Sequence, residues 1–281
     1  MQEHPMKIAV VGGGGRMGKS LIKVIHENPS VVLQSVIVRK GSSLVGKDVS
    51  SVIGISPIGV KFSDDISKSL QSIDGIIDFS SPACTLETLE ISSKMNLVYV
   101  IGTTGFSLQE NERINSFALH SRIVKSGNMS LGINFLSLLV KFAARCLPAN
   151  HWDFEILEMH HRHKLDSPSG TALFLGEAIA NGRNSNISDS FMLNRNKQDC
   201  VREEGSIGFA TLRGGSVVGE HSVVIAGEGE SIMLSHSAYD RSIFARGAVT
   251  AAIWALSKAP GLYSMLDVLD FGVFGNGKIN E

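Results

Sequence analysis

The feature that most constrains this chain is a strand, a glycine-rich loop and a helix in direct succession near the N-terminus. Lys7–Val11 is an apolar run of strand character, Gly12–Gly18 reads GGGGRMG, and a helical pattern follows. Gly13, Gly15 and Gly18 match G-x-G-x-x-G. Glycines there permit a tight turn and a close approach to a pyrophosphate, and the helix start supplies N–H groups. This order predicts a dinucleotide-binding βαβ unit. The alternative is a glycine-rich turn with no ligand.

The first half of the chain alternates short apolar strands with helical patterns. Two helix starts are marked by Ser81-Pro82 and by Ser107–Glu110, which has the form of a capping box. Strict alternation of this kind predicts an α/β fold, a Rossmann-type doubly wound parallel sheet with helices on both faces. The later strands are expected at Val31–Val38, Gly75–Phe79, Leu97–Ile101 and Ile123–Val124.

The pattern changes after about residue 130. A helix is expected from about Gly132 to Leu147, and a final helix from about Ser242 to Lys258 can return to the first domain. The polar segment from about Gly182 to Glu204 is predicted to be a long loop. Closely spaced strands with glycine-rich turns predict a second α+β domain with a mainly antiparallel or mixed sheet. These strands are expected at Asp153–Met159, Ser206–Leu212, Ser216–Ile225 and Ser231–Ser237.

This pattern divides the chain between two domains. We expect a dinucleotide-binding domain of residues 1–130 with 241–281, and a substrate-binding and oligomerisation domain of residues 131–240.

The positive and negative charges of the chain nearly cancel, with 26 Lys and Arg against 27 Asp and Glu. That balance argues against a nucleic-acid or membrane-surface partner held by bulk charge. The longest apolar stretch, Leu131–Leu147, carries a lysine and an arginine, which favours a buried helix over a membrane span.

The cysteines and the N-terminus both favour a cytosolic protein. The N-terminus has no basic stretch followed by an apolar stretch and a cleavage site, so no signal peptide is expected. No two cysteines are close enough in sequence for a C-x-x-C or zinc-ribbon pattern. Reduced thiols are therefore expected at Cys84, Cys146 and Cys200.

The end of the second strand bears on the choice of nucleotide. A dinucleotide site usually has an acid about 20 residues after the glycine loop, where it binds the ribose 2′-hydroxyl. Here the strand ends in Val38, Arg39 and Lys40, so the acid is absent and two cations follow. Guanidinium and ammonium groups suit a 2′-phosphate, which predicts that NADPH is preferred and NADH remains possible. The alternative is a solvated strand end.

The most informative stretch is Glu158–Leu173, which reads EMHHRHKLDSPSGTAL. Three His, one Arg and one Lys lie within five residues, and such a density of cations is costly without an anion. Ser167 is expected as a helix N-cap with Pro168 as the first helical residue. The N–H groups of Gly170 and Thr171 would then face the basic loop and could bind a carboxylate. Together these features indicate a small polyanionic substrate, such as a dicarboxylate.

Two other interpretations of the histidine cluster remain open. His160, His161 and His163 could bind a metal, but the spacing is not H-E-x-x-H and the loop is crowded with cations, so no metal site is predicted. A solvated basic surface loop is the second alternative.

Read together, these segments resemble the dihydrodipicolinate (4-hydroxy-tetrahydrodipicolinate) reductases, and the resemblance covers nearly the whole chain. The stretch H-H-R-H-K-x-D-x-P-S-G-T-A is the most specific part of it. The segments that carry the resemblance are GGGGRMG (Gly12–Gly18), DFSSP (Asp78–Pro82), IGTTGF (Ile101–Phe106), SGNMSLGIN (Ser126–Asn134), Glu158–Leu173, GFATLRGG (Gly208–Gly215), VVGEH (Val217–His221) and FARGA (Phe244–Ala248).

The resemblance implies a reaction and a set of site residues. The family reduces a cyclic, imine-bearing dicarboxylate to tetrahydrodipicolinate on the diaminopimelate route to lysine, with hydride from NAD(P)H. By match to the motif, His160 is the proton donor or acceptor, Lys164 is a second donor, His161 contacts substrate, and Gly170 and Thr171 bind a carboxylate. The family is typically a homotetramer built through the sheet of the second domain. Members that use NADH well often have an acid where this chain has Val38. The matching cofactor residues are Gly12, Gly13, Gly14, Gly15, Arg16, Met17, Gly102, Thr103, Thr104, Ser126, Gly127, Asn128 and Met129, to which the strand end adds Arg39.

The residues themselves leave two further functions open. A non-catalytic dinucleotide sensor needs the glycine loop but neither His160 nor Lys164. Another two-domain NADP oxidoreductase, such as a semialdehyde dehydrogenase, needs a reactive cysteine, and no cysteine here has an activating context in the sequence.

Overall fold

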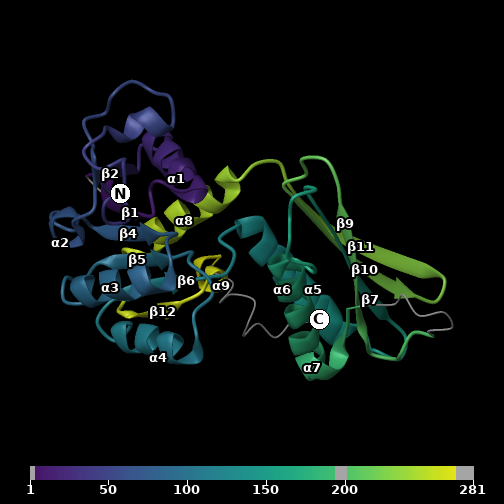
Figure 1. The fold of residues 1–281 in the computed structure, drawn as a ribbon. Coiled ribbons are helices and arrows are strands. Elements are labelled where there is room, and N and C mark those ends of the chain that lie inside the picture. Colours follow the sequence, from purple (N-terminus) through teal and green to yellow (C-terminus); the bar gives the residue numbers. More distant parts are fainter. Residues whose placement is uncertain (1–3, 194–200, 270–281) are drawn as a thin grey trace. The chain divides into compact units, whose positions relative to one another are not determined.

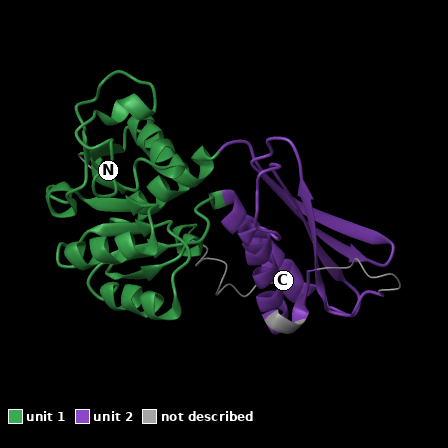
Figure 2. Ribbon diagram, viewed as in Figure 1, with its two compact units in different colours: residues 1–131, 241–281 green, residues 132–240 purple. Residues whose placement is uncertain are grey.

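A computed structural model describes residues 4–193 and 201–269 of the chain (Figure 1). The chain forms two compact units, coloured separately in Figure 2. Unit 1 comprises residues 1–131 and 241–281, and unit 2 comprises residues 132–240. The chain therefore leaves unit 1 once and returns to it through the helix that begins at Ser242.

Unit 1 is built around a parallel sheet, as the alternation of strands and helices predicts. In the described residues this sheet has seven strands in the order β12-β6-β5-β4-β1-β2-β3. Because β1 has β4 on one side and β2 on the other, the chain reverses its direction of winding at β1. The strands are β1 (Met6–Val11), β2 (Val31–Ile37), β3 (Phe62–Ser63), β4 (Gly75–Asp78), β5 (Val98–Ile101), β6 (Arg122–Lys125) and β12 (Gly261–Tyr263).

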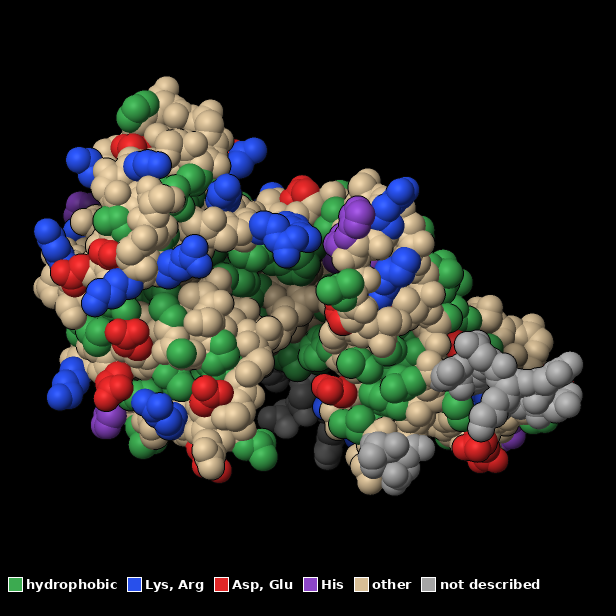
Figure 3. Space-filling model, in the orientation of Figure 1, with side chains coloured by type: hydrophobic (Ala, Val, Ile, Leu, Met, Phe, Trp, Pro, Cys, Tyr) green, Lys and Arg blue, Asp and Glu red, His purple; other side chains and the backbone are tan. Residues whose placement is uncertain are grey.

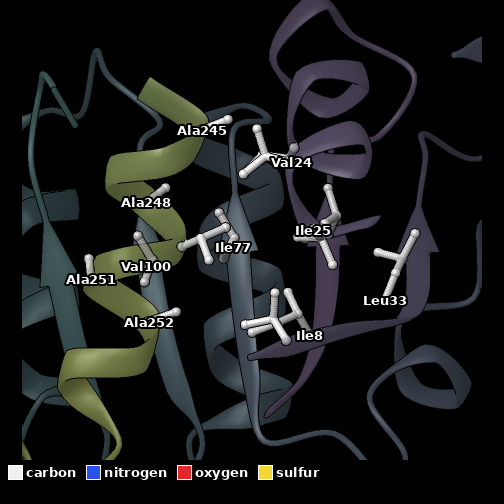
Figure 4. Close-up of a cluster of buried hydrophobic side chains, with 14 of the residues drawn as sticks. Ile8, Val24, Ile25, Leu33, Ile77, Val100, Ala245, Ala248, Ala251 and Ala252 are labelled. Atoms are coloured by element: carbon white, nitrogen blue, oxygen red, sulfur yellow. The ribbon is translucent and has the colours of Figure 1, made fainter. Parts of the chain in front are cut away.

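Helices cover both faces of the unit 1 sheet. On one face, α1 and α8 pack together over β1, β4 and β5, and the alanines of α8 let that helix approach the sheet closely (Figure 4). The opposite face is covered by α2, α3 and α4, whose apolar side chains form a second core with Tyr99. The helices of unit 1 are α1 (Arg16–Glu27), the 3-10 helix Val49–Val52, α2 (Ile66–Ser69), α3 (Pro82–Ser92), α4 (Leu108–Phe117), α8 (Ser242–Ala255) and α9 (Met265–Val268).

Unit 2 is a mixed sheet with helices on one face. Its described strands have the order β11-β10-β7-β9-β8, with β10 antiparallel to β7 and β11, and β9 parallel to β7 and β8. Apolar residues alternate along β7 and β10, and the buried set packs against α5 and α6. The elements are α5 (Leu131–Cys146), β7 (Asp153–His160), α6 (Gly170–Arg183), α7 (Ile187–Ser190), β8 (Phe191–Met192), β9 (Ile207–Arg213), β10 (Gly219–Gly227) and β11 (Glu230–Ala238).

The structure confirms the predicted fold class but corrects the prediction for two segments. The segment Gly182–Glu204 is not one long loop, because it contains the end of α6, then α7 and β8. The Phe191 and Phe209 rings lie 4.9 Å apart, so β8 is held by side-chain packing that polarity alone does not reveal. Residues 194–200 of this segment lie outside the described residues. The tail after Pro260 also adds a strand, β12, which pairs with β6.

Candidate active site

The predicted cofactor segments of unit 1 all follow strands of one parallel sheet. The glycine loop follows β1, Arg39 follows β2, Gly102 follows β5, and Ser126 follows β6. The strands β6, β5, β4, β1 and β2 are consecutive neighbours, so these segments share the carboxyl edge of the sheet. Ligands of open α/β sheets bind at this edge, next to the strand where the winding reverses.

The glycine loop has the close packing that a dinucleotide site requires. Gly12 has φ +80°, and a Cβ there would lie 2.7 Å from the Phe79 carbonyl oxygen. A Cβ at Gly18 would lie 2.4 Å from the Gly12 carbonyl oxygen, so α1 contacts the loop backbone directly. Gly15 is the N-cap of α1 and supplies no side chain to the helix start. The Gly12, Gly13 and Gly15 N–H groups donate to backbone carbonyls, so a pyrophosphate here would meet the N–H groups in the first turn of α1.

A buried carboxylate organises the second predicted cofactor segment, Gly102–Thr104. Asp78 lies at the end of β4 and accepts hydrogen bonds from the Ser80 hydroxyl at 2.6 Å, the Tyr99 hydroxyl at 2.8 Å and the Thr103 hydroxyl at 3.3 Å. Burial raises the pKa of Asp78, while the hydrogen bonds from Ser80 and Tyr99 oppose that rise. The network ties the ends of β4 and β5 together, which holds the Gly102–Thr104 segment in place.

The remaining cofactor residues differ in exposure. Arg39 is exposed beyond the end of β2, whereas the Val38 side chain is 7% exposed and faces the glycine loop. A Cβ at Gly14 would lie 3.5 Å from Val38 Cγ1. The Ser126 hydroxyl donates to the Asn128 carbonyl at 2.8 Å. The Met129 side chain is buried in the core, so only its backbone is placed to reach a ligand.

In unit 2, the His160 ring is held at the end of β7 by a carboxylate on the same strand. His160 Nδ1 lies 2.5 Å from Glu158 Oε2. Glu158 and His160 are two positions apart on β7, so strand alternation places both on the face that carries α5 and α6. His221 of β10 lies beside the ring, with centroids 5.0 Å apart. A Cβ at Gly219 would lie 3.0 Å from His160 Nε2, so the missing side chain leaves space beside that nitrogen.

The start of α6 differs by two residues from the expected one. Ser167 is not the N-cap and Pro168 is not the first helical residue; the N-cap is Ser169, whose hydroxyl accepts from the Ala172 N–H at 3.1 Å. Ser169 is selected because its hydroxyl also hydrogen-bonds His221 Nε2 at 3.0 Å and its own N–H donates to Glu158. Gly170 and Thr171 are thus the first two residues of α6, where helix N–H groups bind anions.

The loop between β7 and α6 carries the other basic residues. Lys164 Nζ lies 2.8 Å from Asp166 Oδ1, and the Lys164 ammonium keeps the pKa of Asp166 below its usual value. His161 is half-buried, and its ring lies 6.4 Å from the exposed His163 ring. On unit 2, Figure 3 shows histidine and basic side chains next to one another at the surface. The structure thus brings His160, Lys164 and the start of α6 together within unit 2.

The charges around His160 determine its protonation. Burial lowers the pKa of His160 below its usual value, the Glu158 carboxylate opposes this, and the Lys164 and Arg213 cations add to it. Burial alone would raise the pKa of Glu158, but hydrogen bonds from Arg213, His160 and the Ser169 N–H hold it below its usual value. Burial also lowers the pKa of His221 to about 4, so this neighbour is neutral near pH 7.

Within residues 4–193 and 201–269, no three His, Cys, Asp or Glu side chains gather as a possible metal site.

Comparison with known proteins identifies the family. The models described as the N-terminus and the C-terminus of dihydrodipicolinate reductase match residues 6–129 and 132–269. The chain belongs to the dihydrodipicolinate reductase family. It is 54% identical over 269 residues to the 4-hydroxy-tetrahydrodipicolinate reductase of Sinorhizobium medicae and 55% identical to that of Rhizobium meliloti. In both comparisons the alignment covers 96% of this chain and 99% of the relative.

Solved structures show the same fold. The dipicolinate-bound dihydrodipicolinate reductase from Paenisporosarcina sp. TG-14 matches with a TM-score of 0.75 at 23% identity, covering 92% of this chain and 97% of that one. An amine dehydrogenase from Mycobacterium smegmatis matches with a TM-score of 0.59 at 12% identity, covering 94% and 96%. The dihydrodipicolinate reductase fold is therefore shared with more distant oxidoreductases.

No helix in the described parts of the chain combines the length and apolarity needed to cross a membrane.

Four residues that shape the site were given no role in the sequence analysis. They are Glu158, Ser169, Arg213 and His221. Glu158 could have been found, because an acid two residues before His160 on a strand must share its face. Ser167 was predicted as the N-cap of α6, but the N-cap is Ser169. Arg213 and His221 arrive from β9 and β10, and only the strand pairing shows that they meet β7.

Proposed function

We propose that this chain reduces 4-hydroxy-tetrahydrodipicolinate to tetrahydrodipicolinate with a reduced nicotinamide nucleotide. Family membership over nearly the whole chain supports the reaction. The observation that carries the proposal is the arrangement in unit 2, where His160, held at Nδ1 by Glu158, is grouped with Lys164 and the first residues of α6. A nucleotide sensor has no need of this group of residues. The proposed reaction also does not use the free cysteines Cys84 and Cys146, whereas a semialdehyde dehydrogenase needs a reactive cysteine.

The proposed chemistry needs a proton at the substrate ring. The 4-hydroxyl of the substrate leaves as water to give a conjugated imine, to which reduced nicotinamide would supply hydride when bound, leaving negative charge on the substrate. His160 Nε2, on the ring side away from Glu158, is the proposed proton donor. A bound dicarboxylate adds negative charge near His160 and raises its pKa, which opposes the effect of burial. Lys164 is the proposed second donor and stabilises the developing charge.

The start of α6 is the proposed carboxylate site. Gly170 and Thr171 are its first two residues, and Gly170 is exposed with open space where a side chain would project. Backbone N–H groups and the positive end of the helix favour a carboxylate there. His161, in the adjoining loop, is the proposed further contact with substrate. These roles agree with the small dicarboxylate expected from the sequence, and the proposal involves no metal, nucleic acid or membrane.

The nucleotide is proposed to bind along the carboxyl edge of the unit 1 sheet. The glycine loop is the proposed pyrophosphate site: Gly12 forms the tight turn after β1, and α1, which begins with Arg16 and Met17, presents its first N–H groups there. Exposed Arg39 favours the 2′-phosphate of NADPH.

A cytosolic location remains a prediction, supported by free Cys84 and Cys146; Cys200 lies outside the described residues.

We further propose a homotetramer built through the open face of the unit 2 sheet. The face opposite α5 and α6 exposes Leu157, Leu212 and Met233, whose exposed fractions are 38%, 49% and 63%. These exposed apolar side chains come from β7, β9 and β11 of one sheet, and they form a surface that a second copy can cover. The substrate residues lie on the other face, so this assembly leaves them available.

Charge on that face should disrupt the assembly. The double substitution Leu212→Glu and Met233→Glu places like charges in a symmetric contact, and we expect mainly monomers or dimers by light scattering after gel filtration. Leu119→Glu is the matched control, because Leu119 is 72% exposed on unit 1, and it should leave the oligomer unchanged. An unmodified protein that elutes as a monomer, or a double variant that remains tetrameric, contradicts the proposed interface.

The reaction itself is tested by a steady-state assay. Purified protein should oxidise NADPH only when the cyclic substrate is present, with a stoichiometry of one nucleotide per product. A sensor would bind NADPH without consuming it. Absence of substrate-dependent oxidation by a folded, NADPH-binding protein would overturn the proposed function.

A further inference from the structure

Glu158 is a buried carboxylate whose two oxygens are both fully engaged. Its side chain is 1% exposed. Oε2 accepts from His160 Nδ1 at 2.5 Å and from Arg213 Nη1 at 2.8 Å. Oε1 accepts from Arg213 Nη2 at 2.9 Å, from the Ser169 N–H at 3.0 Å and from the Thr211 hydroxyl at 3.3 Å. A carboxylate is costly to bury unless such donors are present, so this arrangement requires all its partners.

The contact with Glu158 decides which nitrogen of His160 carries a proton. An ionised carboxylate has no hydrogen to donate, so Nδ1 must be the donor in the 2.5 Å contact. In neutral His160 the lone pair is then on Nε2, and in the charged form Nε2–H is the proton that can be given away. Nε2 is the nitrogen beside Gly219, where no side chain obstructs it.

The other oxygen connects Glu158 to the proposed carboxylate site. Ser169 donates its N–H to Oε1 and is the N-cap of α6, so the carboxylate holds the residue immediately before Gly170. The Ser169 hydroxyl is fixed at the same time by His221 and by the Ala172 N–H. One side chain therefore sets the position of the His160 ring relative to the N–H groups at the helix start.

Arg213 extends this connection to Lys164. Its two terminal nitrogens each bind one oxygen of Glu158, which is the bidentate geometry that arginine provides and lysine does not. Nη2 also donates to the Asp166 carbonyl at 2.7 Å, and the Asp166 carboxylate lies 2.8 Å from Lys164 Nζ. Arg213 thus holds both Glu158 and the segment that carries the second proposed donor.

We propose that Glu158, clamped by Arg213, is the positioning residue of this site: it fixes His160 with Nδ1–H toward the protein and Nε2 toward the substrate, and it aligns that ring with the start of α6. The inference rests on the proposed role of His160. It predicts that the negative charge of Glu158, and not only its volume, is required for turnover.

The primary test is Glu158→Gln, which keeps the shape and removes the charge. We expect kcat to fall ~10–100-fold, as for other residues that orient a reacting group, with little change in NADPH affinity. The loss of an anion beside His160 disfavours its charged form, so the fall of activity with rising pH should move to lower pH. The charged or titratable groups that face His160 are Glu158 on β7, Lys164 on the following loop, Arg213 on β9 and His221 on β10.

A spectroscopic measurement separates positioning from general stability. Nitrogen NMR of the ring should show the proton of neutral His160 on Nδ1 in the parent and shifted toward Nε2 in Glu158→Gln. Asp153→Asn is the matched control, because Asp153 pairs with Arg202 at 2.9 Å at the other end of β7, and kcat, pH profile and tautomer should be unchanged. Arg213→Lys keeps the charge but loses the bidentate contact, so we expect a smaller loss of kcat with the Nδ1–H form retained.

The outcomes are distinct. If Glu158→Gln has the parent kcat, pH profile and tautomer, or only a lower melting temperature, the inference is overturned while the proposed function stands. If His160→Ala is fully active, the proposed function fails first. Should Glu158→Gln not fold, Arg213→Lys decides: a parental kcat would contradict the clamp, and an intermediate kcat with the Nδ1–H tautomer retained would support it.

Discussion

Replacing His160 or Lys164 by alanine should lower kcat by ~10²–10⁴-fold, the range usual for a general acid–base group. His160 is expected to show the effect because its Nε2 is the nitrogen left free by the contact with Glu158. Lys164 is expected to show it because its ammonium supplies charge to the same site. NADPH affinity, measured by fluorescence titration, should change little, since both residues belong to unit 2 and the nucleotide segments belong to unit 1.

His151→Ala is the matched control for this result. His151 is an exposed histidine of unit 2 that hydrogen-bonds Asn150 and has no proposed role, so its substitution should leave kcat unchanged. Full activity in both His160→Ala and Lys164→Ala would remove the basis for assigning acid–base chemistry to this loop.

NADPH should be used in preference to NADH, chiefly through tighter binding. A charge-assisted hydrogen bond from Arg39 to the 2′-phosphate favours NADPH by ~10-fold or more, although exposure to solvent reduces the effect. Arg39→Ala should weaken NADPH more than NADH. Val38→Glu should recover NADH use, because the Val38 side chain faces the glycine loop where a carboxylate could accept the ribose hydroxyls. Specificity constants for both nucleotides measure these changes.

The control for the nucleotide preference is another arginine of unit 1. Arg113 is about half exposed on α4, where it pairs with Glu90, so Arg113→Ala should keep the parental ratio of specificity constants. Equal specificity constants for NADPH and NADH in the unmodified protein would show that Arg39 and Lys40 are only a solvated strand end.

The fold was largely predictable because its signals are local. Glycines between a strand and a helix, and caps such as Ser81 and Ser107, mark element boundaries within a few residues of sequence, and both caps are confirmed. The pairing of β12 with β6 was missed, because three residues such as Gly261–Tyr263 carry too little periodicity to be recognised as a strand.

The site was only partly predictable because its geometry depends on contacts between strands. The histidine cluster and the helix start are visible in one continuous stretch of sequence. The choice of Ser169 over Ser167 as N-cap depends on contacts with Glu158 and His221, and the second of these comes from β10. Arg213 likewise meets Glu158 only because β9 pairs with β7. Local propensity therefore located the chemistry within two residues, and tertiary contacts determined its final geometry.

This protein is expected to transfer hydride from a nicotinamide nucleotide to a cyclic dicarboxylate. The most direct test supplies NADPH deuterated on the transferring face of its C4 carbon, together with 4-hydroxy-tetrahydrodipicolinate, and measures the mass of the product. We expect tetrahydrodipicolinate that carries the deuterium, formed by the unmodified protein and at a greatly reduced rate by His160→Ala. Unlabelled product, or no product from a protein that still binds NADPH, would contradict it.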